Sequence, residues 1–182
     1  MNDSHSLINI RLAAPKDQSS VISMANEVYS TSEREFWKEG YYRLNAEEFN
    51  HYEKAKWLHL AEINNELVGC VLMRPVDGIT TSFSMLICHP NHRKKGIGKT
   101  LVEHVFKIAL EDNYLKMQLE ILSPIEWLHD EKEFLKRWYD SLGFKLLKEV
   151  NFADYYPNHG KYMKCPLLFS LYEKDLTTDQ TR

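Results

Sequence analysis

Apolar and polar residues alternate at the start of the chain, and this alternation predicts a β-strand over residues 8–13. The spacing of apolar residues then becomes helical and predicts a helix over residues 15–29, with Pro15 suited to its first turn. Residues 30–45 follow no regular period but hold several aromatic residues. The chain is therefore predicted to begin as a strand and a helix, followed by a long aromatic connection.

The same two periods predict the remaining elements. Strands are predicted over residues 57–63, 67–73, 79–88, 114–122, 144–152 and 167–174, and helices over residues 46–54, 97–112 and 133–142. Asn64 and Asn65 suit a tight turn between two of these strands, and Gly143 suits the left-handed position after the last helix. The order β-α-α-β-β-β-α-β-α-β-β predicts an α/β fold in which helices cover a mixed sheet.

Composition narrows the class of protein. The 182 residues are 43% hydrophobic and 27% charged, so we expect one globular domain over residues 1–182, loose only at residues 1–6 and 177–182. A formal net charge of −3 argues against a nucleic-acid partner. We expect a cytoplasmic protein without a membrane partner, since no apolar run is long enough to cross a bilayer and none begins the chain. The spacing of the three cysteines does not fit a zinc site, and no carboxylate or cysteine joins His89, His92 and His104 at ligand spacing, so no metal is expected.

The most informative stretch joins the end of a predicted strand to the start of a predicted helix. Gly96 and Gly98 lack Cβ atoms, so the backbone between strand and helix can approach a ligand closely. The free N–H groups of the first helical turn and the helix dipole favour an anion there. Four cationic side chains lie in the same stretch: Arg93, Lys94, Lys95 and Lys99. We therefore predict a pyrophosphate-binding loop.

Other glycine motifs fit this stretch less well. The dinucleotide-binding fingerprint requires a third glycine at the position of Leu101. The P-loop of nucleoside triphosphatases requires a glycine at the position of Arg93, although Gly98-Lys99-Thr100 matches its end. Neither motif is complete.

Two segments resemble motifs of the GNAT acetyltransferase superfamily. Arg93-Lys94-Lys95-Gly96-Ile97-Gly98 matches that family's Gln/Arg-x-x-Gly-x-Gly/Ala motif, and Tyr139-Asp140-Ser141-Leu142-Gly143-Phe144 resembles its later Tyr-x-x-x-Gly-Phe element. Leu86-Ile87-Cys88-His89-Pro90 resembles the strand ending before the first motif, with Cys88 where valine is usual. The resemblance implies a mostly antiparallel sheet whose central strands, residues 79–88 and 114–122, splay apart.

The resemblance also implies acetyl-CoA, or another acyl-CoA, as the donor substrate. Its pyrophosphate would contact the glycine loop, and its pantetheine arm would pair with the strand end as an added strand. The residues that would bind it are Leu86, Ile87, Cys88, Arg93, Lys94, Lys95, Gly96, Ile97, Gly98, Lys99 and Thr100. An asparagine that commonly binds the pantetheine arm in this family is replaced here by Ser123-Pro124, so the chain departs from the family pattern on that side.

Acyl transfer to an amine requires a proton for the departing thiolate and a base for the amine. The resemblance places Tyr139 as the general acid; the alternative is a core tyrosine with a hydrogen-bonded hydroxyl. Glu120 is a candidate base, and an exposed carboxylate on a strand is an equal alternative. His129 is a second candidate, because imidazole titrates near neutral pH, although a solvated loop histidine is the simpler interpretation.

The aromatic connection over residues 29–43 is a predicted lid on the acceptor side. Its rings Trp37, Tyr41 and Tyr42 would bind the acceptor, with core packing and a contact between two copies of the chain as alternatives. We predict an acetyl-CoA-dependent N-acetyltransferase that acts on a small-molecule amine by direct transfer in a ternary complex. A non-catalytic acyl-CoA-binding module and a protein N-terminal or lysine acetyltransferase are the alternatives.

Overall fold

The structure is a computed structural model that describes residues 7–179 of the chain. The predictions for residues 1–6 and 180–182 lie outside the described part. Two compact units are present. The first consists of residues up to Val28, Arg43–Arg74 and Phe83–Ile108; the second consists of Tyr29–Tyr42, Pro75–Ser82 and the residues from Ala109 onward.

The first unit contains the N-terminal strands and three helices. Its elements are β1 (Asn9–Leu12), a 3-10 turn (Pro15–Asp17), α1 (Gln18–Ser32, up to Val28), α2 (Ala46–Lys54), β2 (Leu58–Ile63), β3 (Glu66–Pro75), the end of β4 (Thr80–Cys88), a second 3-10 turn (Pro90–His92) and α3 (Ile97–Glu111). Strands β1, β2 and β3 pair antiparallel. Asn64 and Asn65 join β2 to β3 with φ angles of 53° and 64°, which confirms the predicted tight turn.

Helix α3 packs closely on strand β3 because Gly69 has no side chain. A Cβ atom on Gly69 would lie 2.6 Å from the carbonyl oxygen of Ile87 and 2.9 Å from Cγ2 of Ile97. It would also lie 3.3 Å from Cδ1 of Leu101, and both Ile97 and Leu101 are buried. The position therefore brings the end of β4 and the start of α3 against the same point of β3.

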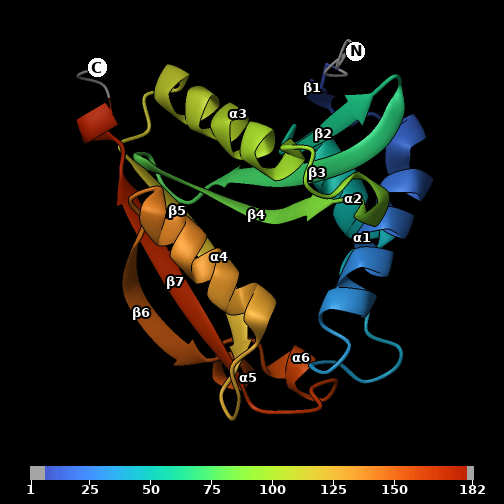
Figure 1. The fold of residues 1–182 in the computed structure, drawn as a ribbon, viewed down its shortest axis with the longest axis vertical. Helices are drawn as coiled ribbons and strands as arrows, with labels where there is room; N and C mark the ends of the chain where they lie inside the picture. The colour runs from blue at the N-terminus through green and yellow to red at the C-terminus, as the bar shows by residue number, and fades with distance from the viewer. Residues whose placement is uncertain (1–6, 180–182) are drawn as a thin grey trace. The chain divides into compact units, whose positions relative to one another are not determined.

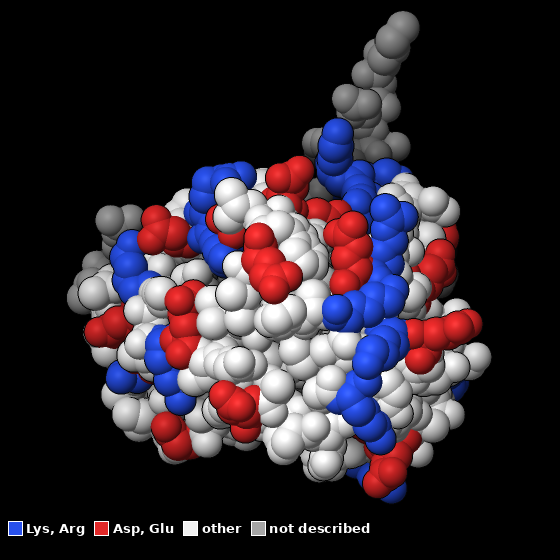
Figure 2. All heavy atoms as spheres, turned by 90° about the horizontal axis from the view of Figure 1, so that it is seen from below, with Lys and Arg blue, Asp and Glu red and all other residues white. Residues whose placement is uncertain are grey.

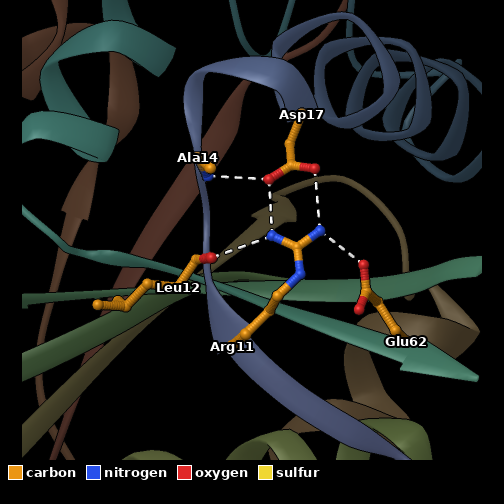
Figure 3. A network of polar contacts seen from close by, with 5 residues as sticks. All are labelled: Arg11, Leu12, Ala14, Asp17 and Glu62. Carbon is orange, nitrogen blue, oxygen red and sulfur yellow. Dashed lines mark hydrogen bonds and ion pairs between the residues drawn. The ribbon is translucent and has the colours of Figure 1, made fainter. Parts of the chain in front are cut away.

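An ion-pair network links β1 to the 3-10 turn that follows it (Figure 3). The Arg11 guanidinium donates to both carboxylate oxygens of Asp17 and to Oε1 of Glu62 on β2, the last at 2.6 Å. Asp17 also accepts the backbone N–H of Ala14 at 2.8 Å. The network fixes how the chain turns from β1 towards α1.

The second unit contains the C-terminal strands. Its elements are the start of β4, β5 (Lys116–Pro124), α4 (Asp130–Ser141), β6 (Lys145–Asn151), α5 (Phe152–Tyr155), α6 (Pro157–Gly160), β7 (Leu167–Asp175) and a 3-10 turn (Thr177–Asp179), together with the last turn of α1. Strand β5 pairs antiparallel with β7 along its whole length, and β7 pairs antiparallel with β6. Helix α4 packs along β5 (Figure 1).

The predicted fold class is confirmed. Seven strands form a mostly antiparallel sheet in the order β1-β2-β3-β4-β5-β7-β6, and helices flank it. The parallel pairing of β4 with β5 comprises only Thr80–Ser82 and Lys116–Gln118, although each strand has nine residues. The parallel ladder is therefore short.

Some element boundaries differ from the sequence prediction. Helix α1 continues to Ser32, and α4 begins at Asp130 instead of residue 133, with three acidic residues in its first turn. The short helices α5 and α6 were not predicted, because four residues are too few to show a helical period. Thr177–Asp179 form a 3-10 turn in the segment predicted to be loose.

Strand β6 is the last strand of the sheet order and lies at an edge. Its pairing with β7 is irregular between Leu146 and Lys148. Leu146 and Leu147 are exposed, and Lys145 and Lys148 flank them. Two exposed leucines on an edge strand thus stand between two lysines.

The surface carries charges of both signs. Figure 2 shows lysine and arginine side chains interspersed with acidic side chains over the face that it draws. Within residues 7–179, no helix combines the length and the apolar character needed to cross a membrane.

Candidate active site

The predicted pyrophosphate loop lies in the first unit, between the end of β4 and the start of α3. Lys94 and Gly96 have left-handed φ angles of 64° and 78°. Left-handed residues in a turn direct successive N–H groups into a concavity that suits an anion. A phosphate site at this loop stays a prediction, with which the two left-handed residues are compatible.

Space is open at the start of α3. A Cβ atom built on Gly96 or on Gly98 would meet no atom within 4 Å. The first hydrogen bond of α3 runs from the N–H of Thr100 to the carbonyl of Gly96, so the N–H groups before Thr100 precede the helical ladder. These residues fit a pyrophosphate group, which would occupy the open space and accept from the free amides.

The lysine side chains of the loop differ in their partners. Lys94 and Lys95 are exposed, and Nζ of Lys95 lies 3.3 Å from Nδ1 of His92. Lys99 forms an exposed ion pair with Glu103 at 3.7 Å, a contact that contributes little to stability. Ile97 is buried, so its contribution to a phosphate site would come from its backbone.

The end of β4, Leu86–Cys88, was predicted to pair with the pantetheine arm. Ile87 is buried with its carbonyl against Gly69, whereas Leu86 and Cys88 are partly exposed. The N–H of His89 donates to Val68 at 2.8 Å, so this part of β4 stays bonded to β3.

Met85 interrupts the regular conformation of β4 directly before Leu86. It is buried and has a φ angle of 49°, a left-handed conformation that costs about 1–3 kcal/mol in a non-glycine residue. The Cys70 thiol donates to the Met85 carbonyl at 3.8 Å. Strain of this kind gathers at functional sites, and nothing in the sequence indicated it.

Two histidines pair beside α3 in the first unit. Nε2 of His104 lies 3.1 Å from Nδ1 of His59 on β2. Burial, and to a lesser extent the neighbouring His104, lowers the pKa of His59 to about 4. Among the residues that the structure describes, no three histidine, cysteine or acidic side chains gather as a metal site would require.

The predicted general acid lies in the second unit. Tyr139 is one of two buried residues of α4, and its ring packs edge-on against Phe144 with 5.9 Å between centroids. Burial raises the pKa of the Tyr139 phenol, and Tyr29 at the end of α1 raises it further. The phenol therefore stays protonated at neutral pH, as a proton donor must.

The two candidate bases occupy different environments. Glu120 lies on β5 opposite Leu171 of β7, half-buried between the buried Leu119 and Ile121. His129 precedes α4, and its Nδ1 is buried without a hydrogen-bond partner among the described residues. The Ser123 hydroxyl at the end of β5 is also buried without a hydrogen-bond partner among the described residues.

The three aromatic residues predicted to bind the acceptor do not share one environment. Trp37 and Tyr41 stack with their ring centroids 4.0 Å apart, whereas Tyr42 is 69% exposed. Phe36 and Trp37 are buried in a cluster with Phe152 and Leu167. Core packing thus accounts for much of the aromatic connection, and backbone contacts such as Lys38 N–H to the Tyr162 carbonyl hold it in place.

Comparison with known proteins decides the family. The model of the acetyltransferase (GNAT) family matches residues 22–144, more than half of the chain. This chain belongs to the GNAT acetyltransferase family.

Solved structures agree with this family fold. An N-acetyltransferase from Staphylococcus aureus Mu50 is similar with a TM-score of 0.68 at 18% identity, over 94% of this chain and 100% of that one. The yncA protein from Salmonella typhimurium, solved with its cofactor acetyl-CoA, is similar with a TM-score of 0.65 at 18% identity, over 93% and 94% of the chains. The ribosomal-protein-S18-alanine N-acetyltransferase from Escherichia coli is similar with a TM-score of 0.67 at 13% identity, over 93% and 94%.

As a GNAT protein the chain is an acetyl-CoA-dependent N-acetyltransferase, and acetyl-CoA is its co-substrate. The glycine loop of the first unit leaves open space at the position where the pyrophosphate of this co-substrate is predicted to bind. The roles assigned to the individual residues of the GNAT site, in the loop and in the second unit, stay predictions.

Sequence reasoning missed two residues beside the predicted GNAT site. Gly69 had a signal, since an isolated glycine inside an apolar strand indicates close backbone approach. Met85 had none, because an apolar residue in an apolar strand carries no mark of an unusual φ angle.

Proposed function

We propose that this acetyltransferase moves the acetyl group of acetyl-CoA to the amine of a small-molecule acceptor, by direct transfer in a ternary complex. The observation that supports the donor half of the proposal is the basic loop Arg93–Gly98, which opens onto free space at the start of α3. Its backbone conformation and its cations suit the pyrophosphate of the donor.

We assign the binding of the donor to two neighbouring segments of the first unit. The free amides at Ile97, Gly98 and Lys99 would donate to the pyrophosphate, with Arg93, Lys94 and Lys95 supplying positive charge. The end of β4 at Leu86–Cys88 would present backbone groups to the pantetheine arm. The left-handed Met85 precedes these residues and interrupts the regular conformation of the strand.

In the transfer step, the amine nitrogen attacks the thioester carbonyl carbon and the carbon–sulfur bond breaks. We assign Tyr139 the role of giving its phenolic proton to the leaving thiolate, a role for which its protonated state at neutral pH is suited. The attacking nitrogen loses a proton, and Glu120 on β5 is the proposed acceptor, directly or through water. The phenol regains its proton from solvent before the next turnover.

Direct transfer is supported by the state of the cysteines. Burial raises the pKa of Cys70 to about 12, and it also raises the pKa of Cys88 and of Cys165. A covalent acetyl-cysteine route would need a thiolate with a lowered pKa. None of the chain's three cysteines has that character, so a ternary complex is the simpler route.

The acceptor side is assigned to the aromatic connection. Tyr41 is the partly buried member of the stacked pair, so its outer face is the proposed contact with the acceptor, and Trp37 supports it from behind. Tyr41→Ala should raise the acceptor KM and leave the acetyl-CoA KM nearly unchanged. An equal rise in the KM values of both substrates would argue against the assignment.

The test of the function is a panel of amines with acetyl-CoA, scored by the release of free CoA thiol. Polyamines, amino acids, amino sugars and short peptides with free N-termini should all be included. Turnover with a small amine supports the proposal, whereas turnover with peptides alone supports a protein acceptor. Peptides are included because a ribosomal-protein alanine acetyltransferase shares the fold. Tight acetyl-CoA binding without turnover on any amine would support a non-catalytic binding module instead.

A further inference from the structure

A buried ion pair joins the end of α1 to the first turn of α4 in the second unit. Nζ of Lys132 donates to Oε1 of Glu33 at 2.5 Å, and the two side chains are only 11% and 5% exposed. The residues are 99 positions apart in the sequence. The pair is therefore a tertiary contact between two elements, set inside the unit.

Two further contacts orient the Glu33 carboxylate and the Lys132 ammonium. The second carboxylate oxygen of Glu33 accepts the indole N–H of Trp37 at 2.9 Å. The Lys132 ammonium lies 5.6 Å from the ring centroid of Phe36, within the range of a cation–π contact. Both oxygens of Glu33 thus have donors, and the ammonium is held between a carboxylate and an aromatic face.

The ion pair and the predicted general acid share one face of α4. Lys132 and Tyr139 are the two buried residues of this helix and lie seven positions apart, which places them on the same side. The N–H of Glu33, the residue directly after α1, donates to the carbonyl of Tyr29 on α1, so these two residues are one helical turn apart. Tyr29 also acts electrostatically on Tyr139. The chain at the end of α1 therefore contacts α4 through Glu33 and Lys132, and Tyr29 lies close enough to Tyr139 to act on its phenol electrostatically.

Stability alone does not account for a charged pair at this place. The cost of taking two charges out of water can exceed their attraction, and a well-packed apolar pair is often as stable or more stable. A hydrogen-bonded ion pair fixes the relative orientation of the two elements that carry it more strictly than an apolar contact does. A proton donor needs such direction, because a displacement of about 1 Å can lower a rate by about 100-fold.

We propose that Glu33 and Lys132 are a positioning pair for this enzyme: they fix the rotation and register of α4 and thereby the place of the Tyr139 hydroxyl. The proposal rests on the acetyltransferase function and on the role of Tyr139 proposed above. Neither residue takes part in the proton transfer itself, and both act through the helix that carries Tyr139.

The experiment removes both charges together, since removing one would leave an unpaired buried charge. Glu33→Leu/Lys132→Met should fold with an unchanged or higher Tm and unchanged acetyl-CoA affinity, while kcat falls by about 10- to 100-fold. The same double substitution in a Tyr139→Phe background should change kcat by less than about 2-fold, because coupled residues are non-additive. Glu33→Gln, which keeps the side-chain size, should show a smaller loss with the same dependence on Tyr139.

The same helix offers a matched control. Glu133 and Lys136 form an ion pair at 2.8 Å with side chains 30% and 26% exposed. Glu133→Leu/Lys136→Met therefore removes one acidic and one basic side chain, as the test variant does, from a more exposed part of the helix. This control should keep the wild-type kcat. A wild-type kcat in the folded Glu33/Lys132 variant would overturn the positioning role, as would an equal loss in the Tyr139→Phe background.

A second measurement does not depend on turnover. In protein with labelled tyrosine rings, the NMR signal of Tyr139, assigned by its loss in Tyr139→Phe, should shift in the Glu33/Lys132 variant and stay in place in the control. An unchanged signal would overturn the positioning role even if no acceptor were acetylated. If the wild type fails to transfer acetyl while the signal shifts, the proposed function fails and the positioning of Tyr139 stands.

Discussion

The Arg11 guanidinium holds both carboxylate oxygens of Asp17, at 2.7 and 2.9 Å (Figure 3). Arg11 is the main cause of a lowered pKa at Asp17, and the backbone N–H of Ala14 lowers it further. Asp17 therefore remains ionised in the folded protein at a pH at which an aspartate of the unfolded chain is already protonated.

Asp17→Asn should reduce the free energy of unfolding by about 1–2 kcal/mol at pH 7, because it removes a charge-assisted pair. A group with a lowered folded-state pKa stabilises the fold above its unfolded pKa, and this contribution is lost as the pH falls through the folded-state value. Urea unfolding at pH 7 and at successively lower pH should show wild type and variant converging in acid. A constant difference at every pH would assign the effect to packing instead.

His59 should make the wild type less stable in mild acid. Its pKa of about 4 lies below the ordinary value of 6.5, so between these values the unfolded chain binds a proton that the folded protein does not. His59→Gln should flatten the fall in stability from pH 6.5 to pH 4, a change of up to about 3 kcal/mol. Thermal unfolding across this range measures it, with the exposed His51→Gln as control; equal slopes would contradict the assignment.

Gly98→Trp should abolish acetyl-CoA binding without loss of the fold. Space is open around this position, so the indole would extend into the proposed pyrophosphate site and not into the core. Calorimetry should show no binding, and the Tm should stay near that of the wild type. Gly78→Trp is the matched control, since a Cβ there also meets no atom within 4 Å, and it should bind normally. Unchanged affinity in Gly98→Trp would place the pyrophosphate elsewhere.

Tyr139→Phe removes only a hydroxyl and keeps the ring against Phe144. A general acid contributes about 10²–10⁴-fold in rate, so kcat should fall by this factor while the Tm and the acetyl-CoA affinity change little. The raised pKa of Tyr139 also predicts that the wild-type kcat does not decline through loss of this proton below about pH 10. Full activity in the variant would show that Tyr139 is a core tyrosine and not the general acid.

Much of this fold was predictable because the signals lie close together in the sequence. The β2–β3 hairpin has its two asparagines, α2 has Asn45 and Glu48 in a reciprocal cap, and the glycine loop joins a strand directly to a helix. Each of these features acts within a few residues, so the local pattern records it.

The features that were not predicted depend on distant residues. Glu33 and Lys132 are ordinary charged residues of two helical segments, and only the fold brings them together. The aromatic connection was expected to be a lid, with core packing as an alternative, and the sequence did not indicate that Phe36 and Trp37 pack against residues more than a hundred positions later. Periodicity shows that a ring will be covered and cannot show whether a substrate or the core covers it.

The irregular pairing of β6 also bears on how this protein behaves at high concentration. An edge strand has unpaired backbone groups that can bond to a strand of another molecule, and two adjacent exposed leucines favour such pairing. The lysines on either side of Leu146 and Leu147 put charge where a foreign strand would add, and the register shift twists the edge away from a flat template. Replacing these lysines should therefore increase fibril-like aggregation and leave acetyl transfer unchanged.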